Sequence, residues 1–237
     1  MFRHHGNRRT LKHNLKIASL LSFVAGYVNV VGFLAVQRLT TNVTGHFAFF
    51  VDEVFKLNLV ESLIYFLYIL FFFLGSFVSS LLIEIVSKTT SRNIFFLPVI
   101  IESIIIFLVG IFGSILMVKF PNLIALSLLF VMGLQNSLVT KISNALVRTT
   151  HLTGLFTDLG IELSQLFFYK KIEERKKLFS TIKLRLRIII FFFIGGIVGG
   201  ILYPYLKLNA LVLPAIILII GLLYDNLKLK VLNWNRK

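Results

Sequence analysis

The chain has 237 residues, of which 57% are hydrophobic and 25 are phenylalanine, and its mean hydropathy is +0.89. Several apolar runs approach the ~20 residues that span hydrocarbon, so the composition indicates an integral membrane protein and excludes an ordinary soluble domain. The formal net charge is +15, but the basic residues lie between the apolar runs and at the ends, which favours membrane orientation and contact with anionic lipids over nucleic-acid binding. The absence of cysteine excludes disulfides and cysteine-based metal sites or nucleophiles.

The first half of the chain begins with a basic tail, residues 1–16, that we expect on the cytoplasmic side. It continues as a three-span unit over residues 17–118. Within this unit we expect crossing helices over 17–36, 62–86 and 94–118. A short amphipathic helix over 46–56 is too short to cross, so we expect it to be re-entrant or interfacial.

The second half follows a turn at residues 119–122 and forms another three-span unit over residues 123–227. It combines three apolar runs with one short helix and one strongly charged segment that we expect in the cytoplasm. The ranges are 123–139 for the fourth span, 155–169 for the short helix, 170–187 for the charged segment, 188–206 for the fifth span and 210–224 for the core of the sixth. A basic cytoplasmic tail over 228–237 ends the chain.

The distribution of basic residues predicts the orientation. With the amino terminus inside and six crossings, 21 of the 25 lysines and arginines lie on the inside. The four on the outside are Arg38, Lys56, Lys119 and Lys207. Because loops rich in lysine and arginine stay cytoplasmic, both termini are predicted to be cytoplasmic.

Two stretches, residues 40–45 and 149–154, share the pattern T-T-x-x-T-G. Hydroxyls at membrane depth need polar partners, so such stretches lie within protein or beside water rather than against lipid. Three further landmarks recur in the same order in both halves. They are G-x-x-N at 26–29 and 133–136, the runs 71–80 and 191–200, and an asparagine five residues before a proline at 93–98 and 209–214. This order indicates an internal duplication.

Each half supplies three crossings, so the second half enters the membrane from the opposite side, as in many secondary transporters. We therefore predict an all-α integral membrane protein with six transmembrane helices. The helices form two inverted three-helix repeats, each with a broken or re-entrant T-T-x-x-T-G segment. Small residues around Gly75 and Gly195 allow another backbone to approach closely, and they suit packing within the chain as well as a homodimer.

The motif residues are the leading candidates for a binding site. Threonine hydroxyls donate and accept hydrogen bonds, and a helix start presents free backbone N–H groups, which suits a polar or anionic group. Threonine also caps helices, and buried amides also hold segments in place, so structural roles stay open beside binding. The candidate residues are Asn29, Thr40, Thr41, Thr44, Gly45, Gln135, Asn136, Thr149, Thr150, Thr153 and Gly154.

Four carboxylates are candidates for coupling to a cation or proton: Glu53, Glu102, Asp158 and Glu162. Glu53 and Glu162 each lie eight residues past a motif glycine, whereas Glu102 lies inside the third predicted span. A carboxylate inside a membrane span is a functional hypothesis by default. The acids that follow the motifs also fit solvated helix ends.

The paired G-x-x-N and T-T-x-x-T-G motifs resemble the YoaK-like family of bacterial multi-pass membrane proteins of unknown function. The resemblance covers nearly the whole chain and implies a bacterial cell membrane, inner or plasma. Two positions depart from the family's pattern, because Asn29 stands where members commonly have Asp and His46 where they commonly have Asn. Since Asn29 does not titrate, proton coupling in this chain would need another residue.

The function expected from the sequence is that of a small secondary transporter for a small polar or charged solute, working by alternating access. The alternative is a non-transport membrane protein, such as a lipid-binding or assembly factor, whose motifs only hold re-entrant segments. The chain carries no G-x-S-x-G, H-E-x-x-H or phosphate-loop motif. We therefore expect no enzyme activity, catalytic residue, metal or cofactor.

Overall fold

The computed structural model describes residues 10–89, 94–143, 147 and 149–234, and side chains up to residue 224. Within these ranges all regular secondary structure is helical. The elements are α1 (Leu11–Val36), α2 (Val43–Phe55), α3 (Leu59–Thr89), α4 (Phe96–Lys119), α5 (Pro121–Ser143), α6 (Leu152–Gln165), α7 (Ile172–Leu206), the 3₁₀ turn η2 (Lys207–Leu211) and α8 (Val212–Trp234). The basic tail over 1–9 and Asn93 lie outside the described residues.

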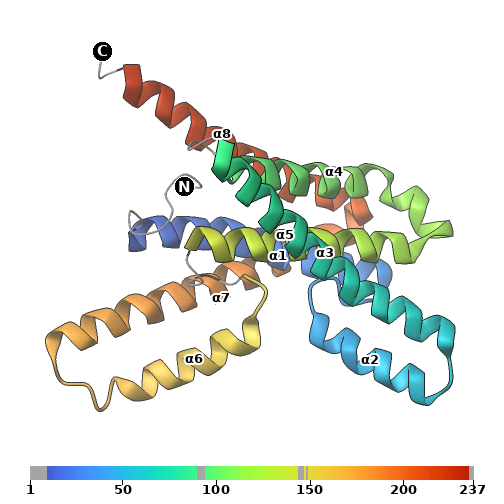
Figure 1. Ribbon diagram of the computed structural model, residues 1–237, viewed down its shortest axis with the longest axis horizontal. Helices are drawn as coiled ribbons and strands as arrows, with labels where there is room; N and C mark the ends of the chain where they lie inside the picture. The colour runs from blue at the N-terminus through green and yellow to red at the C-terminus, as the bar shows by residue number, and fades with distance from the viewer. Residues whose placement is uncertain (1–9, 90–93, 144–146, 148, 235–237) are drawn as a thin grey trace.

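Five helical segments of the described chain are long and apolar enough to cross a membrane. Four are single helices, and the fifth, Ile172–Tyr224, joins α7, η2 and most of α8. The chain reverses at η2 (Figure 1), where Lys207 has a positive φ of 50°. These spans confirm a membrane-embedded helical protein, whereas the six-crossing topology remains a prediction.

Most predicted helices form close to their expected positions, but three boundaries differ. α1 begins at Leu11, within the segment 1–16 that was predicted to be a tail. The charged segment 170–187 and the predicted fifth span 188–206 form one continuous helix, because α7 runs without interruption from Ile172 to Leu206. Lysine, arginine and glutamate are good helix formers, so the charges do not end the helix. The turn expected over 119–122 consists of Phe120 alone, between the end of α4 and the start of α5. α5 begins at Pro121, because proline is well suited to the first position of a helix.

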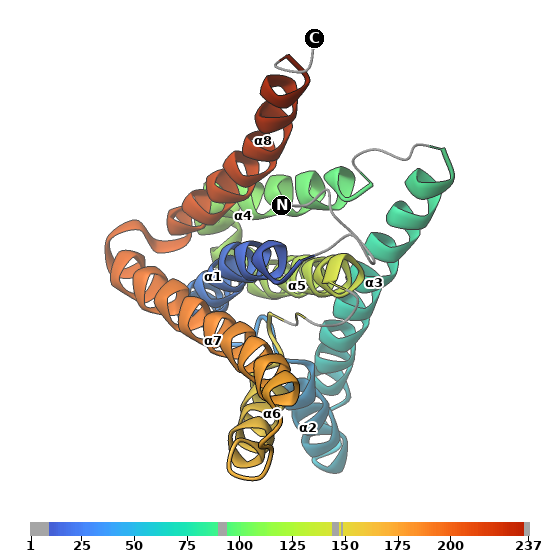
Figure 2. The same ribbon diagram turned by 90° about the vertical axis from the view of Figure 1, so that its left-hand side faces the viewer.

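Two helices, α1 and α5, occupy the centre of the molecule. Figure 2 shows them between α7 on one side and α3 on the other, with α4 and α8 above and α2 and α6 below. The most extensive helix pairings are α1 with α7 and α3 with α5. Fully buried side chains such as Tyr27 on α1 and Met132 on α5 fill the core.

Glycines make these two pairings close. A β-carbon added to Gly26 of α1 would overlap the carbonyl oxygen of Phe192 on α7, and one added to Gly195 would overlap that of Phe23. The other pair of helices repeats this arrangement, with Gly133 of α5 against Phe72 of α3 and Gly75 of α3 against Phe130 of α5. The small-residue patches therefore pack within the chain, as expected of helices that approach closely.

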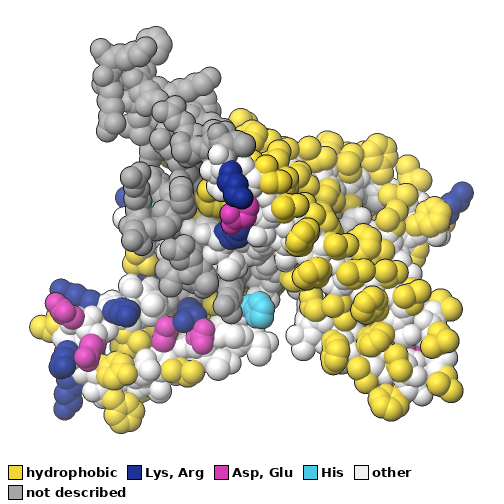
Figure 3. All heavy atoms as spheres, viewed as in Figure 1, with side chains coloured by type: hydrophobic (Ala, Val, Ile, Leu, Met, Phe, Trp, Pro, Cys, Tyr) yellow, Lys and Arg dark blue, Asp and Glu magenta, His cyan; other side chains and the backbone are white. Residues whose placement is uncertain are grey.

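The short helices α2 and α6 splay away from this core. Both begin near the middle of the molecule's long axis and run toward opposite ends, α2 packing on α3 and α6 on α7 (Figure 1). The two hairpins differ in surface. The α2–α3 hairpin exposes Phe47, Phe55 and Leu57, whereas lysines, arginines and acids gather over α6 and the start of α7 (Figure 3).

Candidate functional site

The two T-T-x-x-T-G stretches lie at the starts of the short helices. Asn42 caps α2 and its Oδ1 accepts a hydrogen bond from the backbone N–H of Gly45 at 3.1 Å. α6 starts after His151, without a side-chain cap. Figures 1 and 2 agree in placing the two connections that carry the motifs side by side in the central region below α1 and α5. The motifs therefore bring two helix N-termini into one part of the molecule.

One hydrogen bond ties each motif to the long helix that precedes it. The Thr41 Oγ1 hydroxyl donates to Asn29 Oδ1 on α1 at 2.6 Å. In the second half Asn136 Nδ2 on α5 donates to Thr150 Oγ1 at 2.5 Å. The second threonine of each motif and the asparagine of each G-x-x-N thus have a structural task, which was one of the two roles expected for the asparagines.

The first threonine of each motif has a different environment. Thr40 and Thr149 are both fully buried, and neither hydroxyl has a hydrogen-bond partner among the described residues. An unsatisfied buried hydroxyl costs about 1–3 kcal/mol. Gly32 leaves room for the Thr40 side chain, because a β-carbon there would lie 2.6 Å from Thr40 Oγ1. In the described part of the chain these two buried hydroxyls therefore remain unpaired.

The remaining motif residues face outward. Thr44 and Thr153 are exposed, and Gly45 and Gly154 are partly buried. Thr44 and Thr153 both lie in the first turns of their helices, where backbone N–H groups lack partners within the helix. A polar or anionic group approaching either helix start would meet these hydroxyls.

Gln135 joins α5 to α1. Its Nε2 donates to the Leu21 carbonyl at 2.7 Å, and its Oε1 is buried without a partner among the described residues. Gln135 therefore holds the two central helices together and keeps one free acceptor.

The sequence did not point to the aromatic surroundings of His46. This histidine is fully buried, and its Nε2 lies 2.5 Å from the Leu39 carbonyl. Because a carbonyl only accepts, Nε2 is the donor and Nδ1 is an acceptor, which has no partner in the described part of the chain. The imidazole packs against Tyr65 and Tyr68. The helical spacing of these tyrosines on α3 was the available signal.

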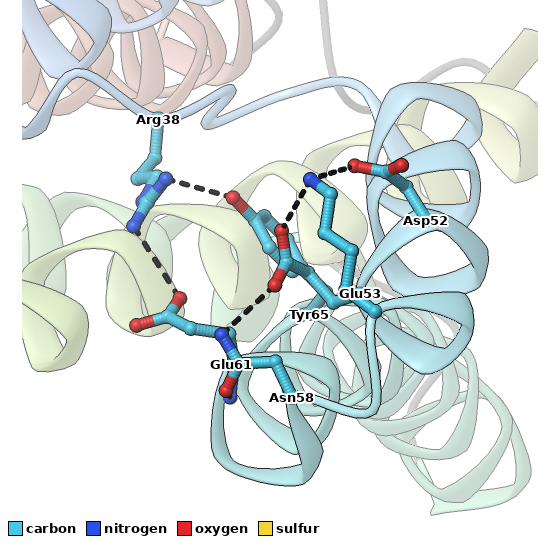
Figure 4. A network of polar contacts seen from close by, with 7 residues as sticks. Arg38, Asp52, Glu53, Asn58, Glu61 and Tyr65 are labelled. Atoms are coloured by element: carbon cyan, nitrogen blue, oxygen red, sulfur yellow. Dashed lines mark hydrogen bonds and ion pairs between the residues drawn. The ribbon is translucent and has the colours of Figure 1, made fainter.

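A polar network covers this region on the side of the α2–α3 hairpin (Figure 4). Arg38 Nη1 donates to the Tyr65 hydroxyl at 2.7 Å, and Nη2 lies 3.5 Å from Glu61 Oε2. Lys56 bonds Asp52 at 2.5 Å and Glu53 at 3.2 Å, and these hydrogen bonds, the one to Asp52 first, raise the pKa of Lys56. The contacts of Arg38 link the connection between α1 and α2 to α3.

The acids after the two motifs occupy different settings. Glu53 stays within the first hairpin, since it also accepts from Asn58 Nδ2 at 2.9 Å. Asp158 and Glu162 instead share Arg185 of α7, at 2.8 Å and 2.9 Å. These two ion pairs attach α6 to α7. All three acids are therefore paired, and the two at aligned positions, Glu53 and Glu162, have different partners.

Glu102 is the exception among the candidate acids. It is fully buried on α4, and neither carboxylate oxygen has a hydrogen-bond partner within the described residues. A buried carboxylate without a partner is costly when charged and is rare inside membrane spans. The described residues contain no cluster of three His, Cys, Asp or Glu side chains suited to a metal ion.

The fold and these polar segments define a membrane-embedded helical protein with two short helices, α2 and α6, that start in its central region. A family model described as "Protein of unknown function (DUF1275)" matches residues 17–224, and the chain therefore belongs to that family. The match covers both motifs and the long helices of both halves of the chain. No curated protein and no solved structure matches the chain. The YoaK-like name stays a resemblance.

Proposed function

We propose that this chain is a small secondary transporter whose solute site lies between two inverted halves near mid-membrane. The proposal rests mainly on the two short helices, α2 and α6, that begin after breaks in the chain at the two motifs. α2 and α6 start in the same central region and run to opposite ends (Figure 1). Discontinuous helices of this kind supply the central sites of transporters, because their free N–H groups and positive dipole ends face the solute.

Repeated contacts support an inverted relation between the halves. Gly26 and Gly133 are the corresponding glycines of the two G-x-x-N motifs, and they oppose Phe192 and Phe72, which are the corresponding residues of the two Phe-rich runs. The reciprocal contacts of Gly75 and Gly195 recur in the same way. An odd number of crossings in each half would give the halves opposite orientation, with both termini in the cytoplasm.

The chemistry of the site favours a small polar or anionic solute. Thr40 and Thr149 offer buried hydroxyls, and Thr44 and Thr153 offer exposed ones at the two helix starts. Helix N-termini favour negative charge. In alternating access the two motifs would act as twin gates or ligand cradles, each open to one side of the membrane in turn.

In this proposal Glu102 couples solute transport to the movement of a proton or cation. It is the candidate acid without a hydrogen-bond or ion partner among the described residues, whereas Glu53, Asp158 and Glu162 are paired. A carboxyl that is buried and neutral in one state and hydrated in another exchanges its proton as the protein changes conformation.

The test is a thermal-shift screen of purified protein against ions, amino acids, nucleobases, sugars and organic acids, followed by flux assays in vesicles with any solute that binds. Binding to the folded state raises its stability by about 2.7 kcal/mol at a hundredfold excess over Kd. Thr44→Val and Thr153→Val should each abolish binding and flux while folded protein remains in the membrane. Thr157→Val is the matched control, because this exposed threonine of α6 bonds only the Thr153 carbonyl of its own helix.

A screen without a hit, in which Thr44→Val and Thr153→Val only reduce the amount of folded protein, would contradict the transport proposal. It would favour the alternative of a non-transport membrane protein, in which the motifs hold the short helices in place.

A further inference from the structure

A second feature of the molecule lies away from the motifs. A cavity of about 720 Å³ lies between α1, α7 and α8. Much of its lining is apolar and includes Leu20, Phe23, Phe191, Ile217 and Ile220. A small hydrophilic solute would leave this apolar wall without a matching partner. The cavity therefore suits an occupant that is itself largely hydrocarbon.

Three cations stand at one end of the same cavity. Lys12 and Lys16 lie one helical turn apart on α1, and Arg187 reaches in from α7. The guanidinium of Arg187 lies 5.5 Å from the centre of the Phe191 ring, and Nη1 donates to Ser19 Oγ at 3.5 Å. None of the three cations forms an ion pair with another described residue. The described residues that line the cavity include no acid that would compensate this charge.

Charged and apolar residues follow each other in order along the walls. On α1 the sequence runs from Lys12 and Lys16 to Leu20 and Phe23, a rise of roughly 16 Å at ~1.5 Å per residue. Arg187 likewise comes one turn before Phe191 on α7.

We propose that this cavity binds one acidic phospholipid, with its phosphate on Lys12, Lys16 and Arg187 and an acyl chain along the apolar wall. The order of charge and apolar surface matches that of the lipid. Basic pockets between transmembrane helices on the cytoplasmic side bind anionic head groups, and the amino-terminal end of α1 is on that side in the orientation that the basic residues favour. The proposal does not depend on transport.

The experiment compares phospholipids with the same acyl chains added to purified protein in a neutral detergent. Phosphatidylglycerol should raise the apparent melting temperature of the wild type in a saturable way. Phosphatidylcholine and inorganic phosphate should not, because one lacks net charge and the other lacks an acyl chain. The triple variant Lys12→Gln, Lys16→Gln, Arg187→Gln should bind phosphatidylglycerol at least tenfold more weakly.

A matched triple variant removes the same charge elsewhere. Lys176→Gln, Lys177→Gln and Lys183→Gln change exposed lysines of α7 that do not line the cavity, and this protein should bind phosphatidylglycerol as the wild type does. If the first triple variant does not fold, Lys12→Gln with Lys16→Gln and Arg187→Gln alone are measured, and each should weaken binding.

Three results would overturn the proposal. Equal stabilisation by phosphatidylcholine would show that head-group charge is not recognised. Stabilisation by inorganic phosphate alone would show a site for a soluble anion. Equal loss of binding in both triple variants would show attraction to overall charge rather than a site at this cavity.

Discussion

The contact between Gly133 and Phe72 gives a sharp test of the packing between the two halves. A β-carbon at Gly133 would lie more than 1 Å inside the usual C···O contact of about 3.3 Å from the Phe72 carbonyl oxygen. Because the obstacle is backbone, α3 and α5 would have to separate along their length. We expect Gly133→Ala to destabilise the folded state by about 1–3 kcal/mol, the usual cost of overpacking, against an intrinsic gain of up to about 1 kcal/mol from helix propensity.

The control is Gly160→Ala on α6, where an added β-carbon would meet nothing within 4 Å. This variant should match the wild type or be slightly more stable. The assay is thermal denaturation in detergent, followed by circular dichroism at 222 nm, and 1 kcal/mol corresponds to a shift of about 2–4 °C for a chain of this size. Gly26→Ala, at the corresponding contact with Phe192, should behave like Gly133→Ala. Equal melting temperatures for Gly133→Ala and Gly160→Ala would refute the close packing.

Three further perturbations test single parts of the structure. Asn136→Ala and Thr150→Val should each lower the free energy of unfolding by about 1–3 kcal/mol, because each leaves a hydrogen-bond partner unsatisfied. In a double-mutant cycle of melting curves, the double variant should lose less than the sum of the two single losses. Additive losses would contradict the hydrogen bond. Arg185→Gln should speed hydrogen exchange in α6 relative to α5, because α6 loses both of its ion pairs to α7. The expected stability loss is about 1 kcal/mol, since these ion pairs are partly exposed. Unchanged exchange would argue against the attachment of α6 to α7 by Arg185. Glu102→Gln should keep the wild-type yield of folded protein in size-exclusion chromatography, since the amide fills the same buried space without a charge. Glu102→Lys should reduce that yield severely, because it buries an unpaired charge. A normal yield of Glu102→Lys would mean that the surroundings of residue 102 are hydrated.

The sequence was sufficient for the coarse architecture because each long helix is encoded locally. Apolar length predicts the long helices, and the spacing of phenylalanines predicts α2. It was also enough to pick out the asparagine and threonine pairs by their recurrence, although not which threonine would be tethered. That distinction depends on how Thr40 and Thr41 point after the chain turns back toward the centre, which is a tertiary property.

Other features depended on contacts between distant segments. Arg185 lies in a charged run that reads as a solvated segment, and its pairing with Glu162 emerges only when α7 continues as a helix beside α6. The burial of His46 requires Tyr65 and Tyr68 from the next helix. Glu102 shows the reverse case, because its position inside an apolar run already indicated an unusual carboxylate.

Transport by alternating access requires that the two short helices, α2 and α6, lead to opposite sides of the membrane. The natural chain has no cysteine, so single cysteines can be placed without removing others. Leu57 follows α2 and Phe168 follows α6, and both are more than three-quarters exposed. We would label Leu57→Cys and Phe168→Cys in intact cells and in inside-out vesicles with a maleimide that does not cross membranes. We expect Leu57→Cys to react only from outside the cell and Phe168→Cys only from the cytoplasmic side. Labelling of both from the same side would contradict the inverted arrangement and the transport mechanism built on it.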